Sequence, residues 1–319
     1  MEGLEPVVVR APDPSQVSSV TALLERVGVA RGRPALSEGK ERELRRAAGR
    51  SSGEPAAGSL VAVVLIGGDR PGEVIGYAQL DVDRQQGRYA AEVVVDLAAP
   101  GPGALADRLV DTVVEEVRGR GGGSLRLWVP GATDEDDARA ERHGFRVERT
   151  LLQMRCVLPL DDTGPASGPA ISTRPFEPGR DEGAWLETNN RAFATHPEQG
   201  HWELATLLAR EREPWFDPDG LLLLEVDGRI GGSCWTKVHR DADPPLGEIY
   251  VIGVDPDYHG RGWGRALTRV GLEWLAGRGL TVGMLYVDAD NRAALSLYRS
   301  MGFVEHHADR AYRVDLDTR

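Results

Sequence analysis

The feature that most constrains the fold of this chain is an order of elements that occurs twice, about 150 residues apart. In each copy, a helical stretch is followed by strands, a glycine-containing loop, a long helix, a further strand and helix, a Gly-Phe pair and a last strand. The chain has 319 residues, which suits two domains better than one. We therefore expect two related domains in tandem.

Strands and helices alternate in both copies, which predicts an α/β fold with a mixed sheet in each domain. In the first copy the expected strands are 59–66, 74–82, 91–95 and 124–129, and the expected helices are 104–118 and 136–143. In the second copy the expected strands are 220–226, 229–239, 246–254 and 283–287, and the expected helices are 265–277 and 291–301.

A segment rich in Pro, Gly, Ser and Asp separates the two copies. It covers residues 159–170, and its composition is typical of a surface linker. We predict an N-terminal domain over residues 1–158 and a C-terminal domain over residues 171–319.

The composition excludes several classes of partner. With 38 basic and 50 acidic residues the net charge is −12, which opposes binding to nucleic acid and to anionic membranes. No apolar run approaches the roughly 20 residues of a membrane span, and the N-terminus lacks the pattern of an export signal. The two cysteines, Cys156 and Cys234, suit a reducing, cytoplasmic setting and are expected to be small buried residues, so no metal is predicted. A monomer is expected, because duplicated halves can pack as a dimer would.

The second copy contains a candidate phosphate site between a strand and a helix. The strand ends at Val254, and the run His259–Gly264, HGRGWG, leads into the next helix. Three alternating glycines let successive backbone N–H groups point inward beside a helix N-terminus, where Arg261 and Arg265 add positive charge. Taken alone, such a run is equally compatible with an ordinary glycine-rich turn.

Two motifs together resemble the GNAT acetyltransferases. The run at 259–264 resembles their motif A, Arg/Gln-x-x-Gly-x-Gly/Ala, with His259 at the Arg/Gln position. About 30 residues later, NRAALSLYRSMGF (291–303) resembles their motif B, N-x-x-A-x-x-x-Y-x-x-x-G-F. The resemblance implies a GNAT fold in each half, acetyl-CoA as co-substrate and a small-molecule amine as acceptor.

The resemblance also implies which residues hold acetyl-CoA. Backbone groups of the strand before the glycine run would hold the pantetheine arm, and Gly253 is interpreted as a position where the arm comes close to the strand. The implied cofactor-binding residues are Ile252, Gly253, Val254, His259, Gly260, Arg261, Gly262, Trp263, Gly264, Arg265, Asn291, Arg292, Ala293, Ala294, Leu295 and Ser296, with Val93, Val94 and Val95 as their counterparts in the first half.

Amine acetylation needs a base for the attacking nitrogen and a group that stabilises the departing thiolate. Glu248 is the candidate base, and strand alternation places it on one face with Tyr250 and Ile252. An exposed glutamate at a strand start is the alternative. Tyr298 in motif B is the candidate acid, and packing on the sheet is its alternative. Because a phenol (pKa ~10) is a weaker acid than a thiol (~8.5), we expect Tyr298 to hydrogen-bond the thiolate, with concerted proton transfer or a lowered pKa.

The first half is predicted to perform no chemistry. Its loop, 96–103, has no arginine and contains Pro102, which has no N–H to donate. Ala140 stands where the second half has Tyr298, and Glu92 does not occupy the position of Glu248. We expect this half to be a packing partner that shapes the acceptor site or keeps a remnant acyl-CoA site.

The acceptor is suggested by a closer resemblance within the family. Segments 196–200, 215–220, 235–239 and 246–256, with a looser likeness in the first half, resemble the tandem branch that acetylates the cysteinyl amine of a cysteine–glucosamine–inositol conjugate. That likeness implies substrate contacts by Glu38, Glu198, Lys237, Glu248 and Tyr286. Acetylation of another small-molecule or peptide amine, or acyl-CoA binding without catalysis, are the alternatives.

Overall fold

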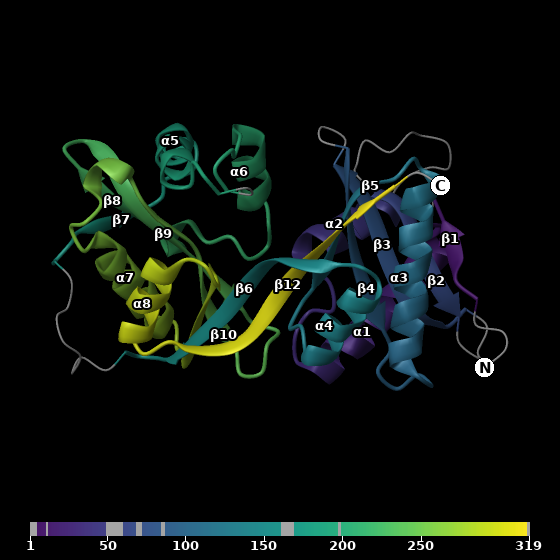
Figure 1. Cartoon of the computed structure of the whole chain (residues 1–319). Helices are drawn as coiled ribbons and strands as arrows, with labels where there is room; N and C mark the ends of the chain where they lie inside the picture. Colours follow the sequence, from purple (N-terminus) through teal and green to yellow (C-terminus); the bar gives the residue numbers. More distant parts are fainter. Residues whose placement is uncertain are drawn as a thin grey trace. The chain divides into compact units, whose positions relative to one another are not determined.

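The computed structural model of the chain describes residues 5–10, 12–48, 60–67, 72–83, 87–160, 169–196 and 199–317. The chain divides into two compact units, which are coloured along the sequence in Figure 1. Unit 1 contains Met1–Leu151 and His307–Arg319, and unit 2 contains Leu152–His306. Most of the predicted linker (residues 161–168) lies outside the described residues.

Unit 1 is a sheet with helices on both faces. Its strand order is β1-β2-β3-β4-β5-β12. The strands are β1 (Val7–Val9), β2 (Leu60–Gly67), β3 (Val74–Asp83), β4 (Arg88–Val95), β5 (Gly123–Val129) and β12 (Val304–Leu316). Apolar side chains of α1 (Pro14–Arg31) and α2 (Glu38–Ala48) form one core, and those of α3 (Pro102–Gly119) and α4 (Asp134–Arg142) form the other.

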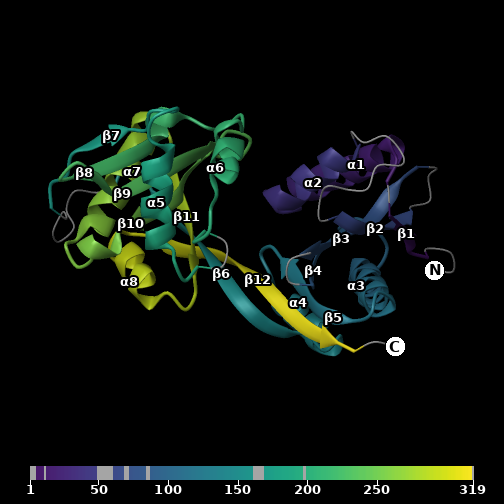
Figure 2. The same ribbon diagram turned by 90° about the horizontal axis from the view of Figure 1, so that it is seen from above.

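Unit 2 repeats this plan, with the strand order β6-β11-β10-β9-β8-β7. The strands are β6 (Arg146–Val157), β7 (Thr173–Pro175), β8 (Leu221–Val226), β9 (Arg229–His239), β10 (Leu246–Val254) and β11 (Val282–Asp288). Helices α5 (Glu182–Ala192) and α6 (Leu204–Glu211) cover one face, and α7 (Trp263–Gly277) and α8 (Arg292–Ser300) cover the other, as Figure 2 shows.

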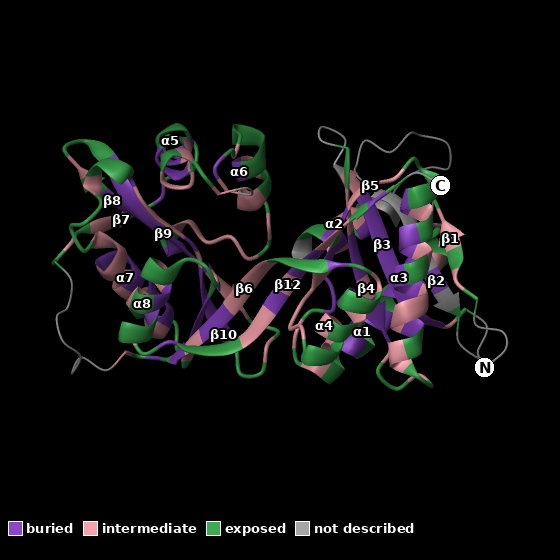
Figure 3. Cartoon of the chain, in the orientation of Figure 1, coloured by how far each residue is buried: buried purple, intermediate pink, exposed green. Residues whose placement is uncertain are grey.

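The sheets contain both kinds of strand pairing, so the predicted α/β class is confirmed. β10 runs parallel to β11 and antiparallel to β9, and β4 runs parallel to β5 and antiparallel to β3. The observed strands β9 and β10 have the predicted ends, whereas α3 and α7 each begin two residues earlier than expected. Buried residues are concentrated in central strands such as β3 and β9, and the helices expose their outer sides (Figure 3).

Each unit takes one strand of its sheet from the other half of the sequence. Met154 and Cys156 of β6 pack in the core of unit 2 with α7 and α8. Tyr312 and Leu316 of β12 pack in the core of unit 1, where β12 pairs with β5 from Arg310↔Val129 to Leu316↔Gly123. The compact units therefore differ from the sequential division at residue 158 predicted above, because pairing between distant strands leaves no local signal in the sequence.

Both cysteines are free and buried, as predicted. Burial raises the pKa of the Cys156 and Cys234 thiols to about 12, so neither is a nucleophile at neutral pH. None of the described helices is both long and apolar enough to cross a membrane.

Candidate active site

The site is built around a β-bulge in β10. Ile249 pairs with Thr236 and Val251 pairs with Trp235, so Tyr250 is an extra residue in the strand. Beyond the bulge the alternation changes phase: Val251 packs with Trp235 under α5 and α6, whereas Ile252 packs on the α7 side. The prediction that Ile252 shares a face with Glu248 is therefore wrong, because the bulge moves it to the other face.

The same stretch of β10 has an edge without a strand partner. β10 and β11 pair from Leu246↔Val282 to Ile249↔Leu285, and no later residue of β10 is in register with β11, both strands being fully described. On its other edge, β10 stays paired with β9 as far as Val254↔Gly232. Backbone groups beyond Ile249 are thus available for an extended ligand, which fits the predicted pantetheine contacts of 252–254.

Gly253 lies where the end of α5 packs on the strand. A Cβ at this position would lie 3.1 Å from Cβ of Ala192 and 3.1 Å from Cε2 of Phe193. The packing of α5 therefore requires a residue without a side chain here, and the approach of the pantetheine arm at Gly253 stays a prediction.

The loop after β10 is anchored by an ion pair. Nε and Nη2 of Arg191 donate to the two carboxylate oxygens of Asp255 at 2.8 and 3.1 Å, and Nη2 also lies 2.9 Å from Oδ2 of Asp257. The Arg191 hydrogen bond lowers the pKa of the buried Asp255 carboxyl. This pair fixes the start of the loop that leads into α7.

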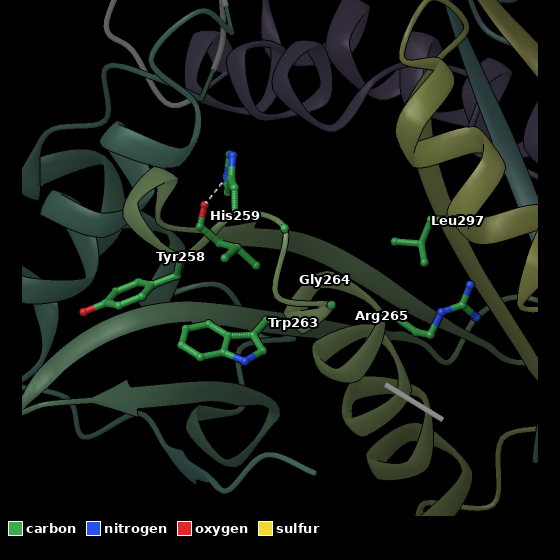
Figure 4. A pocket seen from close by; sticks show the side chains of 9 residues that line it. Tyr258, His259, Trp263, Gly264, Arg265 and Leu297 are labelled. Carbon is green, nitrogen blue, oxygen red and sulfur yellow. Dashed lines mark hydrogen bonds between the residues drawn. The ribbon is translucent and has the colours of Figure 1, made fainter. Parts of the chain in front are cut away.

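The glycine run, 259–264, has the left-handed backbone expected of a phosphate-binding cradle. Gly260 and Gly262 both have φ of +77°, a conformation that favours glycine, and no described side chain caps the N-terminus of α7. Its first N–H groups therefore remain available to an anion. A cavity of about 380 Å³ opens here, lined by Val254, Tyr258, His259, Gly260, Gly262, Trp263, Gly264, Arg265 and Leu297. Figure 4 shows Tyr258 and Trp263 on one side of it and Leu297 of α8 across from them.

The basic residues of the run differ in what they contact. Nε2 of His259, at the family's Arg/Gln position, donates to the carbonyl of Val254 at 3.0 Å and so closes the loop on itself (Figure 4). The Arg261 guanidinium lies over the rings of Tyr258 and Trp263, 5.1 and 5.4 Å from their centroids. Nη2 of Arg265 donates to Oγ of Ser300 at 2.5 Å. Arg261 and Arg265 therefore border the cradle with positive charge.

The predicted residues of motif B divide into two groups. Arg292, Ala293 and Ser296 are exposed in the first turns of α8. Leu295 is buried in the core, and the side chain of Asn291 caps α8 by accepting from the N–H of Ala294 at 3.1 Å. Leu295 thus supports the helix through packing, and its side chain cannot reach a ligand in the cradle.

Tyr298 is buried on the α7 side of the sheet. Its ring lies 5.7 Å from that of Phe303, and only 7% of the residue is exposed. Burial, with a smaller contribution from Cys234, raises the pKa of Tyr298 to about 12. The alternative of a lowered pKa is therefore wrong, and the phenol stays protonated at neutral pH as a hydrogen-bond donor.

Glu248 lies on the opposite face of the sheet, and only 7% of it is exposed. Its Oε2 is 2.6 Å from Nε2 of His239 on β9. The sequence did not single out His239, although its position two residues after Lys237 in a strand places it on the same face. Glu248 and Tyr298 thus lie on opposite faces of the sheet.

Comparison with known proteins identifies the family. The profile of the Acetyltransferase (GNAT) family matches residues 184–303. A mycothiol acetyltransferase of Thermomonospora curvata is 44% identical over 93% of both chains, and one of Streptomyces griseus is 41% identical over 98% of this chain and 96% of its own. This chain belongs to the mycothiol acetyltransferase family. It is a GNAT-type N-acetyltransferase acting on a small molecule. A tandem GNAT protein from the clavulanic acid biosynthesis pathway shares the fold over 98% of both chains, with a TM-score of 0.69 at 17% identity.

Lys237 and Tyr286 lie on the face of the sheet that carries Glu248. Lys237 pairs directly opposite Glu248 in the strand register, and its Nζ lies 4.4 Å from the centroid of Trp215 and 5.4 Å from that of Tyr250. Tyr286 is 38% exposed, and its hydroxyl accepts from Nε2 of Gln153 at 2.8 Å.

Two further polar residues, missed by sequence reasoning, extend this face. The buried Gln153 also accepts from Nε of Arg155 at 2.9 Å, so β6 adds an amide and a guanidinium beside Tyr286. Their signal was present in the sequence, because Gln153 and Arg155 alternate with the core residues Met154 and Cys156.

The remaining predicted acceptor residues are placed only in part. Glu198 lies outside the described residues. Glu38 is the first residue of α2 in unit 1, and nothing is described of its side chain. In unit 1, β4 and β5 pair only as far as Glu92↔Trp128. The backbone of Val93, Val94 and Val95 therefore has an unpaired edge like that of Ile252–Val254, and their binding of an acyl-CoA stays a prediction.

Proposed function

We propose that this enzyme transfers the acetyl group of acetyl-CoA to the cysteinyl amine of the cysteine–glucosamine–inositol conjugate, giving mycothiol. The observation that carries the proposal is an arrangement within unit 2: the glycine cradle follows the stretch of β10 that has no partner in β11, and Glu248 and Tyr298 lie on opposite faces of this sheet. The similar proteins from Thermomonospora curvata and Streptomyces griseus are mycothiol acetyltransferases, which supports this acceptor.

The residues of unit 2 fit acetyl-CoA at both ends. The uncapped N-terminus of α7, with Arg261 and Arg265 at its border, suits a diphosphate. The free backbone of 252–254 suits the amides of a pantetheine arm. Acetyl-CoA supplies the thioester whose acetyl group is transferred and whose sulfur leaves as the CoA thiol.

Each catalytic residue has one task in this reaction. Glu248 takes a proton from the amine, directly or through a water, so that the nitrogen lone pair can form the new C–N bond as the C–S bond breaks. Tyr298 donates a hydrogen bond to the sulfur, which ends as a thiol after proton transfer from the phenol or from solvent. An α-amine has an ordinary pKa of about 7.7–8.0, so a carboxylate is a sufficient base near neutral pH.

The acceptor's hydroxyl groups match the polar face beside Glu248. Sugar and inositol hydroxyls both donate and accept hydrogen bonds. Lys237, Tyr286 and Arg155 offer an ammonium, a hydroxyl and a guanidinium on or near this face. Glu38 and Glu198 complete the proposed set. We further propose that the enzyme works in the cytoplasm as a monomer, without nucleic acid or membrane.

The decisive experiment measures CoA thiol release with a panel of amines. We expect turnover with the cysteinyl conjugate to be about 100-fold faster, or more, than with simple peptides or aminoglycosides, since a site built for a particular set of hydroxyl groups discriminates strongly against acceptors that lack them. Faster turnover of a simple peptide amine would replace the proposed acceptor. Acetyl-CoA binding without thiol release for any amine would instead favour a non-catalytic binding module.

A further inference from the structure

We propose that His239 is a positioning residue for the catalytic base, which it holds by a hydrogen bond from Nε2 to one oxygen of Glu248. This inference rests on the proposed role of Glu248 as the base.

The strand register shows that this contact is selective. Glu248 lies directly opposite Lys237, and His239 lies opposite Leu246, so the carboxylate reaches diagonally across two residues to the imidazole. The ammonium of Lys237 lies instead over the ring of Trp215, at 4.4 Å. Among the described residues, His239 is the hydrogen-bond partner of this carboxylate.

The hydrogen between His239 and Glu248 is carried by the imidazole. An ionised carboxylate only accepts hydrogen bonds, so at 2.6 Å Nε2 of His239 must carry the hydrogen. A carboxylate that is only 7% exposed needs such a donor, because burial without one is costly. The side chain of His239 is 30% exposed, so the imidazole links the buried carboxylate to solvent.

The pair leaves one carboxylate oxygen for the reaction. Oε2 of Glu248 accepts from His239, and Oε1 has no hydrogen-bond partner in the described part of the chain. Fixing Oε2 removes the rotation of the carboxylate and directs Oε1 to the amine. In unit 1, by contrast, Ser37 occupies both oxygens of the buried Glu92, through its N–H at 2.9 Å and its hydroxyl at 2.5 Å.

The test compares two substitutions of His239. His239→Gln keeps an N–H donor near the position of Nε2, and His239→Leu removes it. We expect kcat to fall about 100-fold in His239→Leu, the lower end of what general-base catalysis contributes. In His239→Gln it should fall less than about fivefold, with the KM for acetyl-CoA unchanged in both. Arg240→Gln, at the exposed next residue, is the matched control and should keep the wild-type kcat.

Two outcomes would overturn the inference: an unchanged kcat in His239→Leu, or a kcat in His239→Gln as low as in His239→Leu. Thermal melting and acetyl-CoA affinity show that both variants are folded. The measurements use whichever amine the wild-type enzyme acetylates fastest. If that amine is not the cysteinyl conjugate, the proposed acceptor fails while the role of His239 is still decided.

Discussion

Units 1 and 2 share a sheet with two helix-covered faces, yet they differ at the end of the central strand. β10 has a bulge at Tyr250, whereas β4 pairs with β3 without a register shift from Gly76↔Val95 to Asp83↔Arg88. The small buried Ala140 of α4 stands where α8 has Tyr298. A common fold therefore does not bring a common chemistry, which depends on a few positions around one strand end.

The helix starts that follow these strands differ in charge. α3 begins with Pro102, and a Cβ at Gly103 would lie 3.1 Å from Oε1 of Glu135, so a carboxylate of α4 already lies beside this N-terminus. The first turn of α4 contains Asp134, Glu135, Asp136 and Asp137, whereas the first turn of α8 has no acidic residue. Carboxylates near the start of α3 oppose a diphosphate there, whereas the first turn of α7 has no acidic residue.

The surroundings of the buried Glu92 in unit 1 also differ from those of Glu248 in unit 2. In unit 1, α2 contributes Lys40, which pairs with Asp81 and donates to the carbonyl of Ala90 at 3.0 Å. Lys40 and Asp81 are also close enough to Glu92 to shift its pKa, in opposite directions. Glu92 itself is bonded to Ser37. These polar groups satisfy one another, which leaves none of them for a substrate and supports a structural role for unit 1.

The largest expected effect is on kcat, and it distinguishes the buried Glu248 of unit 2 from the buried Glu92 of unit 1. Glu248→Gln should lower kcat by about 10²- to 10⁴-fold, because the base is lost, whereas Glu92→Gln should leave kcat near the wild-type value. Steady-state kinetics with the preferred amine measures both. A large loss in Glu92→Gln, or none in Glu248→Gln, would break the distinction between the units.

The second prediction tests the effect of a carboxylate at the start of α7, because unit 1 has carboxylates near the start of α3. Gly264→Glu places a carboxylate in the first turn of α7, and we expect the Kd for acetyl-CoA to rise about 100-fold, roughly 2.7 kcal/mol. A Cβ at Gly264 would meet only Leu297, at 3.8 Å, so Gly264→Ala controls for the added side chain. Calorimetry should also show one strong site per chain. Two equal sites, or equal Kd values for the Glu and Ala variants, would contradict the electrostatic argument.

The third prediction concerns the phenol that unit 1 lacks. Tyr298→Phe should lower kcat by about 10- to 100-fold, since it removes a single donor to a developing anion, with little change in acetyl-CoA affinity. Because the pKa of Tyr298 is raised to about 12, the wild-type kcat should show no loss from ionisation of this phenol up to pH ~10. Unchanged turnover in Tyr298→Phe would remove the role.

The smallest expected effects are changes of Tm with pH, and they should have opposite signs for a variant in unit 1 and a variant in unit 2. Burial raises the pKa of Glu92, so its ionisation removes stability as the pH rises above the ordinary 4.5. The wild type therefore loses stability that Glu92→Gln keeps. The Tm of Glu92→Gln minus that of the wild type should be larger at pH 7 than at pH 4. Arg191 lowers the pKa of Asp255, so that pair stabilises above the ordinary 3.8 and its contribution is lost as the pH falls. Arg191→Gln should therefore lower Tm more at pH 5 than at pH 2.5.

These shifts are expected to be about 2–4 °C, which corresponds to roughly 1 kcal/mol in a domain of this size. Scanning fluorimetry between pH 2.5 and pH 7 measures these shifts in Tm. If both differences change in the same direction with pH, the contrast between the two carboxyl groups is wrong.

Local patterns in the sequence predicted much of unit 2. Glycines at 260 and 262 and the strand before them determined the cradle, because left-handed backbone and strand alternation are local properties. The bulge was not predicted, since Tyr250 fits a regular strand equally well and only the register with β9 shows it. His239 and Gln153 were missed for a similar reason: their partners, Glu248 and Tyr286, lie on neighbouring strands.

The exchange of strands has a consequence for biosynthesis. The sheet of unit 1 has no β12 beside β5 until residues 310–316 leave the ribosome, after all of unit 2 has been translated. Until then the edge of β5 presents unpaired backbone groups, which can recruit other chains. A nascent polypeptide that ends before residue 310 therefore has an open sheet edge in its first half, which favours pairing with other chains.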